Sequence, residues 1–270
     1  MIRIMKADMY RIWRSKNIYI TIALLLAVVM LTLFVFREAA TGLVFGIVEY
    51  SETATLQQGF NDGEITSADA AMLALQNVSS MLLYFFIPMF AMVVLPGFSS
   101  GAVKNEISNN ISRTKTYIAR LLLSFLLCLM LLIANVALSI LFMLPFDGLG
   151  YWGSGFALDI ISSALLQSVV IFALVSVGVF LCYVTRARVM VTTLFMAFIT
   201  IPVIFAQAIS TAFDWVLAYM YFDLANQLMF FANMASLDRV QLTRGVVVSI
   251  IWLITTTVAG IRIFNKAEIA

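Results

Sequence analysis

Six stretches of the chain are continuous apolar runs, separated by more polar segments. An α-helix rises about 1.5 Å per residue, so about 20 residues cross the hydrocarbon core of a bilayer. Each of the six runs reaches that length. The pattern predicts an all-α membrane protein with six transmembrane helices, at 17–36, 78–98, 117–144, 158–182, 189–211 and 244–264.

The composition agrees with lipid as the solvent of this chain. Of its 270 residues, 63% are hydrophobic and only 11% are charged, whereas a water-soluble domain has about 25% charged residues. The first run follows a basic segment but is longer than the apolar core of a signal peptide, so we expect an uncleaved span. We find no internal repeat or linker, and we expect one membrane domain over 1–270.

The charges predict the orientation of these helices. If the N-terminus is cytoplasmic, 13 of the 16 Lys and Arg residues lie on the cytoplasmic side, and only Arg37, Arg239 and Arg244 lie outside. Eleven of the 14 acidic residues lie on the outer side. Because basic residues concentrate in cytoplasmic loops, we expect a multi-pass plasma-membrane protein with both termini in the cytoplasm.

Two outer loops are expected to contain further helices. The loop at 37–77 is long and acidic, and its later part, from Ser67 to Gln76, can form a helix that leads into the second span. The loop at 212–243 is rich in aromatic residues, which favour the membrane interface. We expect one or two short helices there, lying on or dipping into the outer leaflet.

The first 16 residues predict an amphipathic interfacial helix. Ile2, Met5, Met9, Ile12 and Trp13 share one helical face, and the basic residues lie off that face. Such a helix lies flat on the inner leaflet, with its basic residues toward anionic headgroups. Its role can be docking, or it can simply anchor the chain.

A second amphipathic segment, at 99–116, follows the second span. Val103, Ile107 and Ile111 are four residues apart and make a narrow apolar stripe on a predicted helix, which Ser99 or Ser100 can cap. The rest of its surface is polar. A short polar helix with one apolar seam fits docking of a soluble partner at the membrane surface. An ordinary connector between two spans would have the same pattern.

This segment resembles the corresponding part of permeases of the ABC-2 family, in which a Gly-x-x-Lys-Asn-x-(Ile/Leu)-Ser run precedes an Ile-Ser-Arg and then a Tyr and a basic residue. The matching positions are Gly101, Lys104, Asn105, Ile107, Ser108, Ile111, Ser112, Arg113, Tyr117 and Arg120. The short basic tail after the last span also resembles the family. Asn110 stands where the family often has Gly or Pro. By this resemblance the segment is a coupling helix that contacts an ATPase through Gly101, Val103, Lys104, Asn105, Ile107, Ser108, Ile111 and Arg113.

The resemblance also implies partners. The chain has no Gly-x-x-x-x-Gly-Lys-Ser/Thr loop to hold phosphates, so ATP and Mg would be bound by two copies of a separate ATPase subunit. Two permease chains, identical or paralogous, would form the pathway, with the first, second and fifth helices at the seam. Candidate pathway residues are Asn135, Pro202 and Gln207. Neutral polar residues at depth, Asn135, Gln167 and Gln207 among them, are also the kind that hold helices together.

The resemblance implies the permease subunit of an ATP-driven exporter, and other functions compete with it. An ion-coupled transporter usually has ionisable groups near the bilayer centre, and none lies deep within the six runs. Arg120 and Arg262 are near helix ends, where they can snorkel to the surface. Sodium coupling through backbone carbonyls stays open, and so does a non-transporting immunity or accessory protein.

Several functional classes are disfavoured by composition. Without histidine, the commonest general base and the usual zinc ligands are missing. We find no nucleophile–base pair, and expect no catalytic residue and no metal. Cys128 and Cys182 fall within apolar runs and read as buried hydrophobic residues. Nothing indicates nucleic-acid binding. An amphipathic substrate, such as a peptide, an antibiotic or a lipid-like molecule, is favoured, with antimicrobial-peptide resistance as one biological context.

Overall fold

The computed structural model describes residues 1–40, 67–99, 101–148, 150, 152, 154–209, 222–232 and 238–266. These residues form helices joined by turns and contain no strand. The elements are α1 (Ile2–Trp13), α2 (Lys16–Ala40), α4 (Ser67–Gln76), the π-helix η1 (Val78–Leu82), α5 (Leu83–Ser99), α6 (Ala102–Ser108), α7 (Arg113–Asp147), α8 (Ser154–Thr185), α9 (Arg188–Ile209), α11 (Leu224–Phe231) and α12 (Arg239–Lys266).

The all-helical membrane fold class predicted from the sequence is confirmed at this level. Five helices, α2, α7, α8, α9 and α12, are long and apolar enough to cross a membrane. A sixth span results if α5 and α6, which are bent by 67° relative to each other, are taken together. The described part of the chain therefore contains five or six helices able to span a membrane, which indicates a membrane-embedded helical protein.

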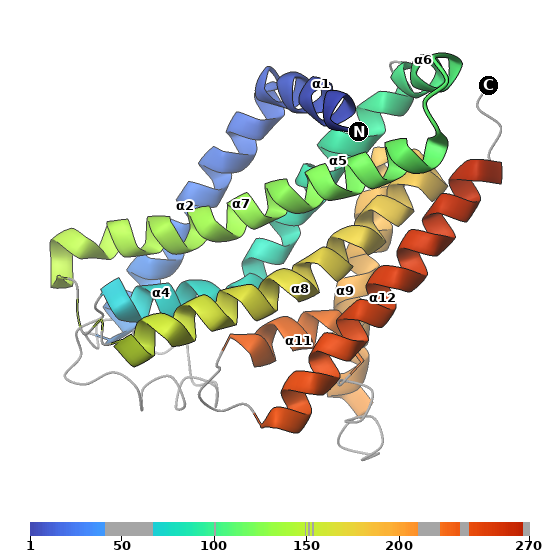
Figure 1. The fold of residues 1–270 in the computed structure, drawn as a ribbon. Coiled ribbons are helices and arrows are strands. Elements are labelled where there is room, and N and C mark those ends of the chain that lie inside the picture. Colours follow the sequence, from blue (N-terminus) through green and yellow to red (C-terminus); the bar gives the residue numbers. More distant parts are fainter. Residues whose placement is uncertain are drawn as a thin grey trace.

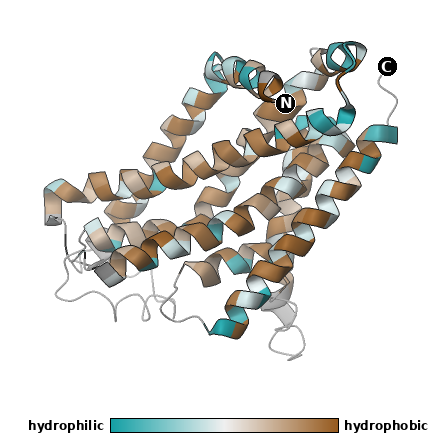
Figure 2. Ribbon diagram, viewed as in Figure 1, coloured by the Kyte–Doolittle hydropathy of each residue, from teal (hydrophilic) through white to brown (hydrophobic). Residues whose placement is uncertain are grey.

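The long helices run side by side between two distinct ends (Figure 1). Helices α1 and α6 and the last turn of α12 lie at one end, which we name the α1–α6 end. The short helices α4 and α11 lie toward the other end, the α4–α11 end. Hydrophobic residues cover the long helices along most of their length, and hydrophilic residues gather toward the α1–α6 end and around α1 and α6 (Figure 2). This distribution matches a bundle embedded in lipid.

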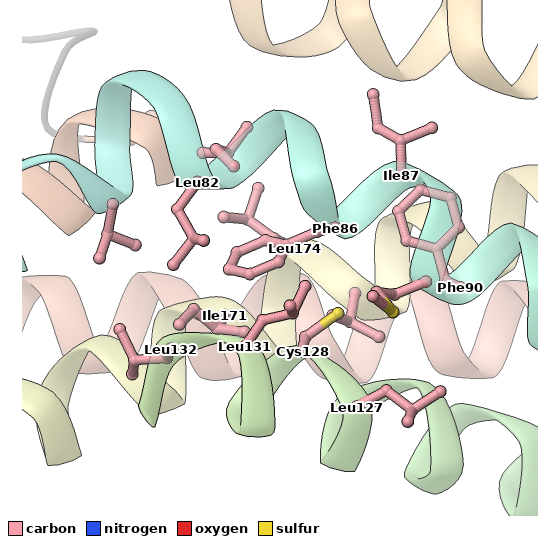
Figure 3. Packing of buried hydrophobic residues seen from close by; sticks show 14 of the residues in the cluster. Leu82, Phe86, Ile87, Phe90, Leu127, Cys128, Leu131, Leu132, Ile171 and Leu174 are labelled. Carbon is pink, nitrogen blue, oxygen red and sulfur yellow. The ribbon is translucent and has the colours of Figure 1, made fainter. Parts of the chain in front are cut away.

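The centre of the bundle is built from η1, α5, α7 and α8. Their buried side chains interlock in one apolar cluster (Figure 3), which includes Leu82, Phe86, Ile87, Phe90, Leu127, Cys128, Leu131, Leu132, Ile171 and Leu174. Between α8 and α12, the hydroxyl groups of Ser176 and Thr256 are 2.6 Å apart and share a hydrogen bond. Helices in lipid associate through close van der Waals packing and such polar contacts, and small residues permit the close approach.

Both short helices expected in the outer loops are present. Helix α4 spans the predicted Ser67–Gln76 and buries an alanine-rich surface, mainly against α7. Helix α11 does not lie on the surface, because Leu224, Leu228 and Phe231 are buried between α8, η1 and α12. The remainder of the two predicted outer loops, at 41–66, 210–221 and 233–237, is outside the described residues.

Two glycines of α8 provide a matched test of this packing. A Cβ at Gly178 would lie 2.6 Å from a ring carbon of Phe90, whereas a Cβ at Gly155 would meet nothing within 4 Å. Because Phe90 is buried and packs on Phe195 at 5.0 Å between ring centroids, its ring has little room to move. We expect Gly178→Ala to lower the free energy of unfolding by about 1–3 kcal/mol, because it overpacks the core.

Thermal unfolding of the purified protein in detergent measures this effect. Gly155→Ala should leave the melting temperature unchanged or raise it, because alanine favours the helix. Equal melting temperatures for the two variants would show that α8 does not pack against Phe90 in this way.

Candidate functional site

The turn between α5 and α6 depends on a glycine. Gly101 adopts φ +68°, in the left-handed region that side chains disfavour, and α6 departs from the direction of α5 by 67°. Gly101 is also the N-cap of α6, with no side-chain hydrogen bond. The predicted cap by Ser99 is wrong, since its hydroxyl donates to the carbonyl of Pro96 within α5. Ser100 is outside the described residues.

Helix α6 is shorter than the sequence predicted. It ends at Ser108 instead of continuing to residue 116, because Asn110 takes φ +60° and reverses the chain. Asn tolerates this conformation better than most residues. Ser112 then caps a new helix, α7, by accepting a hydrogen bond from the amide of Lys115. The expected stripe of Val103, Ile107 and Ile111 is therefore wrong at its last member, which lies beyond the helix.

The remaining predicted coupling residues divide into two sets. Val103 is buried, and Ile107 packs against the apolar cluster. Lys104, Asn105 and Ser108 are exposed on the opposite side of α6. Arg113 lies outside α6, at the first residue of α7. Its Nη1 donates to the carbonyls of Phe264 and Asn265, at 2.9 and 3.1 Å, so it joins the start of α7 to the end of α12.

A buried arginine holds α6 and α1 to the bundle. The side chain of Arg120, on α7, is 0% exposed. Its Nε lies 3.2 Å from Oδ2 of Asp8 on α1, and its Nη2 lies 2.9 Å from Oε1 of Glu106 on α6. The expectation that Arg120 snorkels to the surface is wrong, because two carboxylates reach it within the protein. We name Asp8, Glu106 and Arg120 the charged joint.

The surroundings of the charged joint fit the guanidinium closely. A Cβ at Gly97 of α5 would lie 2.8 Å from Cζ of Arg120, so only glycine leaves the space. Arg11 of α1 pairs with Asp8 at 2.9 Å and donates to the carbonyl of Val93 at 3.0 Å. These contacts connect α1, α5, α6 and α7 at one place.

The charged joint also changes which face of α1 is buried. Ile4, Asp8 and Ile12 face the bundle, whereas Ile2 is 71% exposed and Trp13 is 46% exposed. The predicted apolar face, which contained Ile2 and Trp13 but not Ile4 or Asp8, is therefore rotated from the face that packs. Asp8 was not part of the predicted apolar face, but pairing with Arg120 draws it inward.

Burial affects the acid–base properties of the joint. It raises the pKa of the Glu106 carboxyl, and the neighbouring positive charge of Arg120 opposes this rise.

One sequence signal for the charged joint was available. On the predicted cytoplasmic side the only acidic residues are Asp8, Glu106 and Glu268, and two of these three contact Arg120.

Amide side chains tie the other end of the bundle together. Gln167 of α8 donates from Nε2 to the carbonyls of Leu75 in α4 and Leu228 in α11, at 2.9 and 3.0 Å. Asn135 of α7 donates to the carbonyl of Ala74 at 2.9 Å. All three amide contacts satisfy carbonyls near the ends of the short helices, where intrahelical partners run out. We name this arrangement the amide clamp.

The three candidate pathway residues are on two helices. Asn135 is buried on α7 and faces α4 through its hydrogen bond. Pro202 is half-buried within α9. Gln207 also belongs to α9, but its side chain is outside what the structure describes. Within the described residues, no group of three His, Cys, Asp or Glu side chains could hold a metal ion.

Comparison with known proteins adds no assignment. No protein-family model matches the chain, and no curated protein matches it significantly.

The charged joint predicts a large loss of stability when its cation is removed. Arg120→Met leaves the half-buried Glu106 without a counter-charge and the buried Asp8 with Arg11 alone, which should lower the free energy of unfolding by about 3–5 kcal/mol. The triple variant that adds Asp8→Asn and Glu106→Gln should recover much of that loss, because no carboxylate is left without Arg120 and the partly exposed Arg11 can be solvated. Thermal unfolding in detergent measures both. Arg262→Met, at an exposed position of α12, is the control and should have little effect; a loss equal to that of Arg120→Met would contradict the joint.

The amide clamp predicts a local effect. Gln167→Leu leaves the carbonyls of Leu75 and Leu228 without these hydrogen-bond donors. This loss should lower the free energy of unfolding by about 1–3 kcal/mol. Hydrogen exchange followed by mass spectrometry should show faster exchange in α4 and α11, with α6 unchanged. Ser168→Ala removes a hydroxyl that bonds only within α8 and should leave exchange unaltered. Unchanged protection of α4 and α11 in Gln167→Leu would exclude the clamp.

Proposed function

We propose that this chain is the permease subunit of an ATP-driven exporter, powered by a separate ATPase subunit. The observation that carries the proposal is α6. It is a short helix turned by 67° from α5 at the α1–α6 end, with Lys104, Asn105 and Ser108 exposed. Its other side is fixed by burial of Val103 and by the pair between Glu106 and Arg120. This combination supports docking of a soluble partner.

The charged joint gives the docked partner a mechanical connection to the spans. A force on α6 reaches α7 through Glu106 and Arg120, and α1 through Arg120 and Asp8. Buried, paired charges hold their geometry because breaking one contact leaves a charge without a partner. A connector helix with no docking role would not need such an attachment. The joint therefore supports transmission of ATPase movements into the bundle.

The assembly we propose contains two permease chains and two ATPase subunits, which bind ATP and Mg. The α1–α6 end faces the cytoplasm of a cell with this protein in its plasma membrane, in keeping with the 13 basic residues predicted on that side. The seam between the two chains would involve α2, α5 and α9, with Pro202 and Gln207 toward the pathway. An amphipathic substrate fits the shortage of charge in the spans.

Charge reversal on α6 tests the proposal. Lys104→Glu changes an exposed side chain and should reduce recovery of the ATPase with the tagged permease in mild detergent several-fold, because charge complementarity at the contact is lost. Lys6→Glu, at an exposed position of α1, is the matched control and should retain the ATPase. Both variants should keep the wild-type melting temperature.

Two results would count against an exporter. Transport by the purified chain driven by an ion gradient without ATP would identify an ion-coupled transporter. Recovery of no ATPase with the wild-type chain, under conditions that preserve its fold, would favour an immunity or accessory protein.

A further inference from the structure

A groove opens between α2 and α9, with α5 as its floor. Its volume is about 380 Å³, within the range of about 300–1,000 Å³ typical of sites for small molecules. Apolar side chains on both flanking helices are exposed, for example Ile20, which lines the groove, at 56% and Met190 at 59%. Because α2 and α9 are both long and apolar enough to cross a membrane, lipid chains can reach the groove.

The walls of the groove are apolar in their chemistry. Ile87, Pro88, Met92 and Met196 are among the apolar lining residues, and Tyr84 adds an aromatic ring with a hydroxyl group. Thr21 and Thr192 also line it, but each hydroxyl donates to a carbonyl of its own helix, at 2.9 and 3.0 Å. Their hydroxyl hydrogens are therefore unavailable to a ligand, and an apolar chain is the molecule that these walls accommodate.

One end of the groove carries a positive charge. Asn17 and Arg188 line it at the first turns of α2 and α9. Three other arginines at this end are engaged: Arg11 and Arg120 with Asp8, and Arg113 with α12. Arg262 is exposed on α12 and does not line the groove. Arg186 lies over the ring of Phe98. Arg188 is exposed, and no ion pair among the described residues involves it.

We propose that this groove binds an anionic phospholipid of the surrounding membrane, with an acyl chain between α2 and α9 and the headgroup phosphate at Arg188. The orientation rests on the proposed function, which places Arg188 at the inner leaflet, where anionic lipids concentrate. The proposed seam between two permease chains involves the same three helices, so a second copy of the chain is the competing occupant of this face. At such a seam an anion would screen the positive charge of Arg188 on each chain, so a lipid between the two chains is compatible with the dimer.

Photolabelling of the full-length protein in phosphatidylcholine nanodiscs tests this site. The probes are phosphatidylglycerol and phosphatidylcholine with the same diazirine-bearing acyl chain, and labelled peptides are identified by mass spectrometry. We expect phosphatidylglycerol to label α5 and α9 at the groove. Arg188→Gln should reduce this labelling about fivefold, the effect of one basic residue near an anionic surface, and should leave labelling by phosphatidylcholine unchanged. Arg262→Gln, at an exposed position of α12, should change neither.

A second variant tests the apolar part of the groove. Ala91→Phe places a large side chain among the lining residues and should abolish labelling by both probes. Ala137→Phe, at an exposed position of α7, is its control and should retain labelling. Arg188→Gln changes an exposed side chain and should not disturb folding. It therefore still tests the proposal if Ala91→Phe fails to fold.

Three results would overturn the proposal. They are equal labelling of the groove by both probes, labelling unaffected by Arg188→Gln, or absence of label from the groove together with efficient cross-linking of Ile20→Cys between two copies. The last result would assign the face to a protein contact. None of these measurements uses ATP or the ATPase, so their failure is separate from failure of the exporter proposal.

Discussion

The burial of the Arg120 guanidinium is the constraint on which the α1–α6 end depends. Removing a charged group from water costs several kcal/mol unless opposite charges and hydrogen bonds replace the lost hydration. Asp8 and Glu106 supply them from two short helices, and Gly97 leaves the space. One charge on α7 therefore determines the position of α1, the position of α6 and the small residue on α5. Removing that charge would affect all three.

The opposite end meets a related demand without charge. Short helices that end inside a bundle expose carbonyl groups, and in lipid no water is present to satisfy them. Gln167 and Asn135 donate to three such carbonyls, in α4 and α11. A neutral amide costs less to bury than an ion, which suits a region surrounded by apolar side chains. Both ends thus fix short helices to α7, and the α4–α11 end fixes them to α8 as well.

The sequence predicted the spans and both short helices near the α4–α11 end, because length and hydropathy are properties of single segments. It failed where a segment's structure depends on a distant partner. Nothing near Asp8 indicates that Arg120, 112 positions away, draws it inward. The apolar stripe from Val103 to Ile111 continues past Asn110, so the spacing alone extended the helix beyond the residue at which the chain turns. Among the candidate site residues, Lys104 and Asn105 lie on the exposed face as expected, whereas Arg113 engages α12.

The buried polar contacts leave two spans less constrained than the others. Helices α7, α8 and α12 are joined by Arg113, by the pair of Ser176 and Thr256 and by the amide clamp. The hydroxyls of Thr21 and Thr32 in α2 and of Thr192 in α9 donate to carbonyls of their own helices, and Thr32 also contacts the sulfur of Met81. Apolar packing in lipid has no directional bonds to break, so α2 and α9 can shift against α5 at lower cost than α7 can move against α8. The groove lies between those two helices, where a change in its width disturbs the fewest buried polar groups.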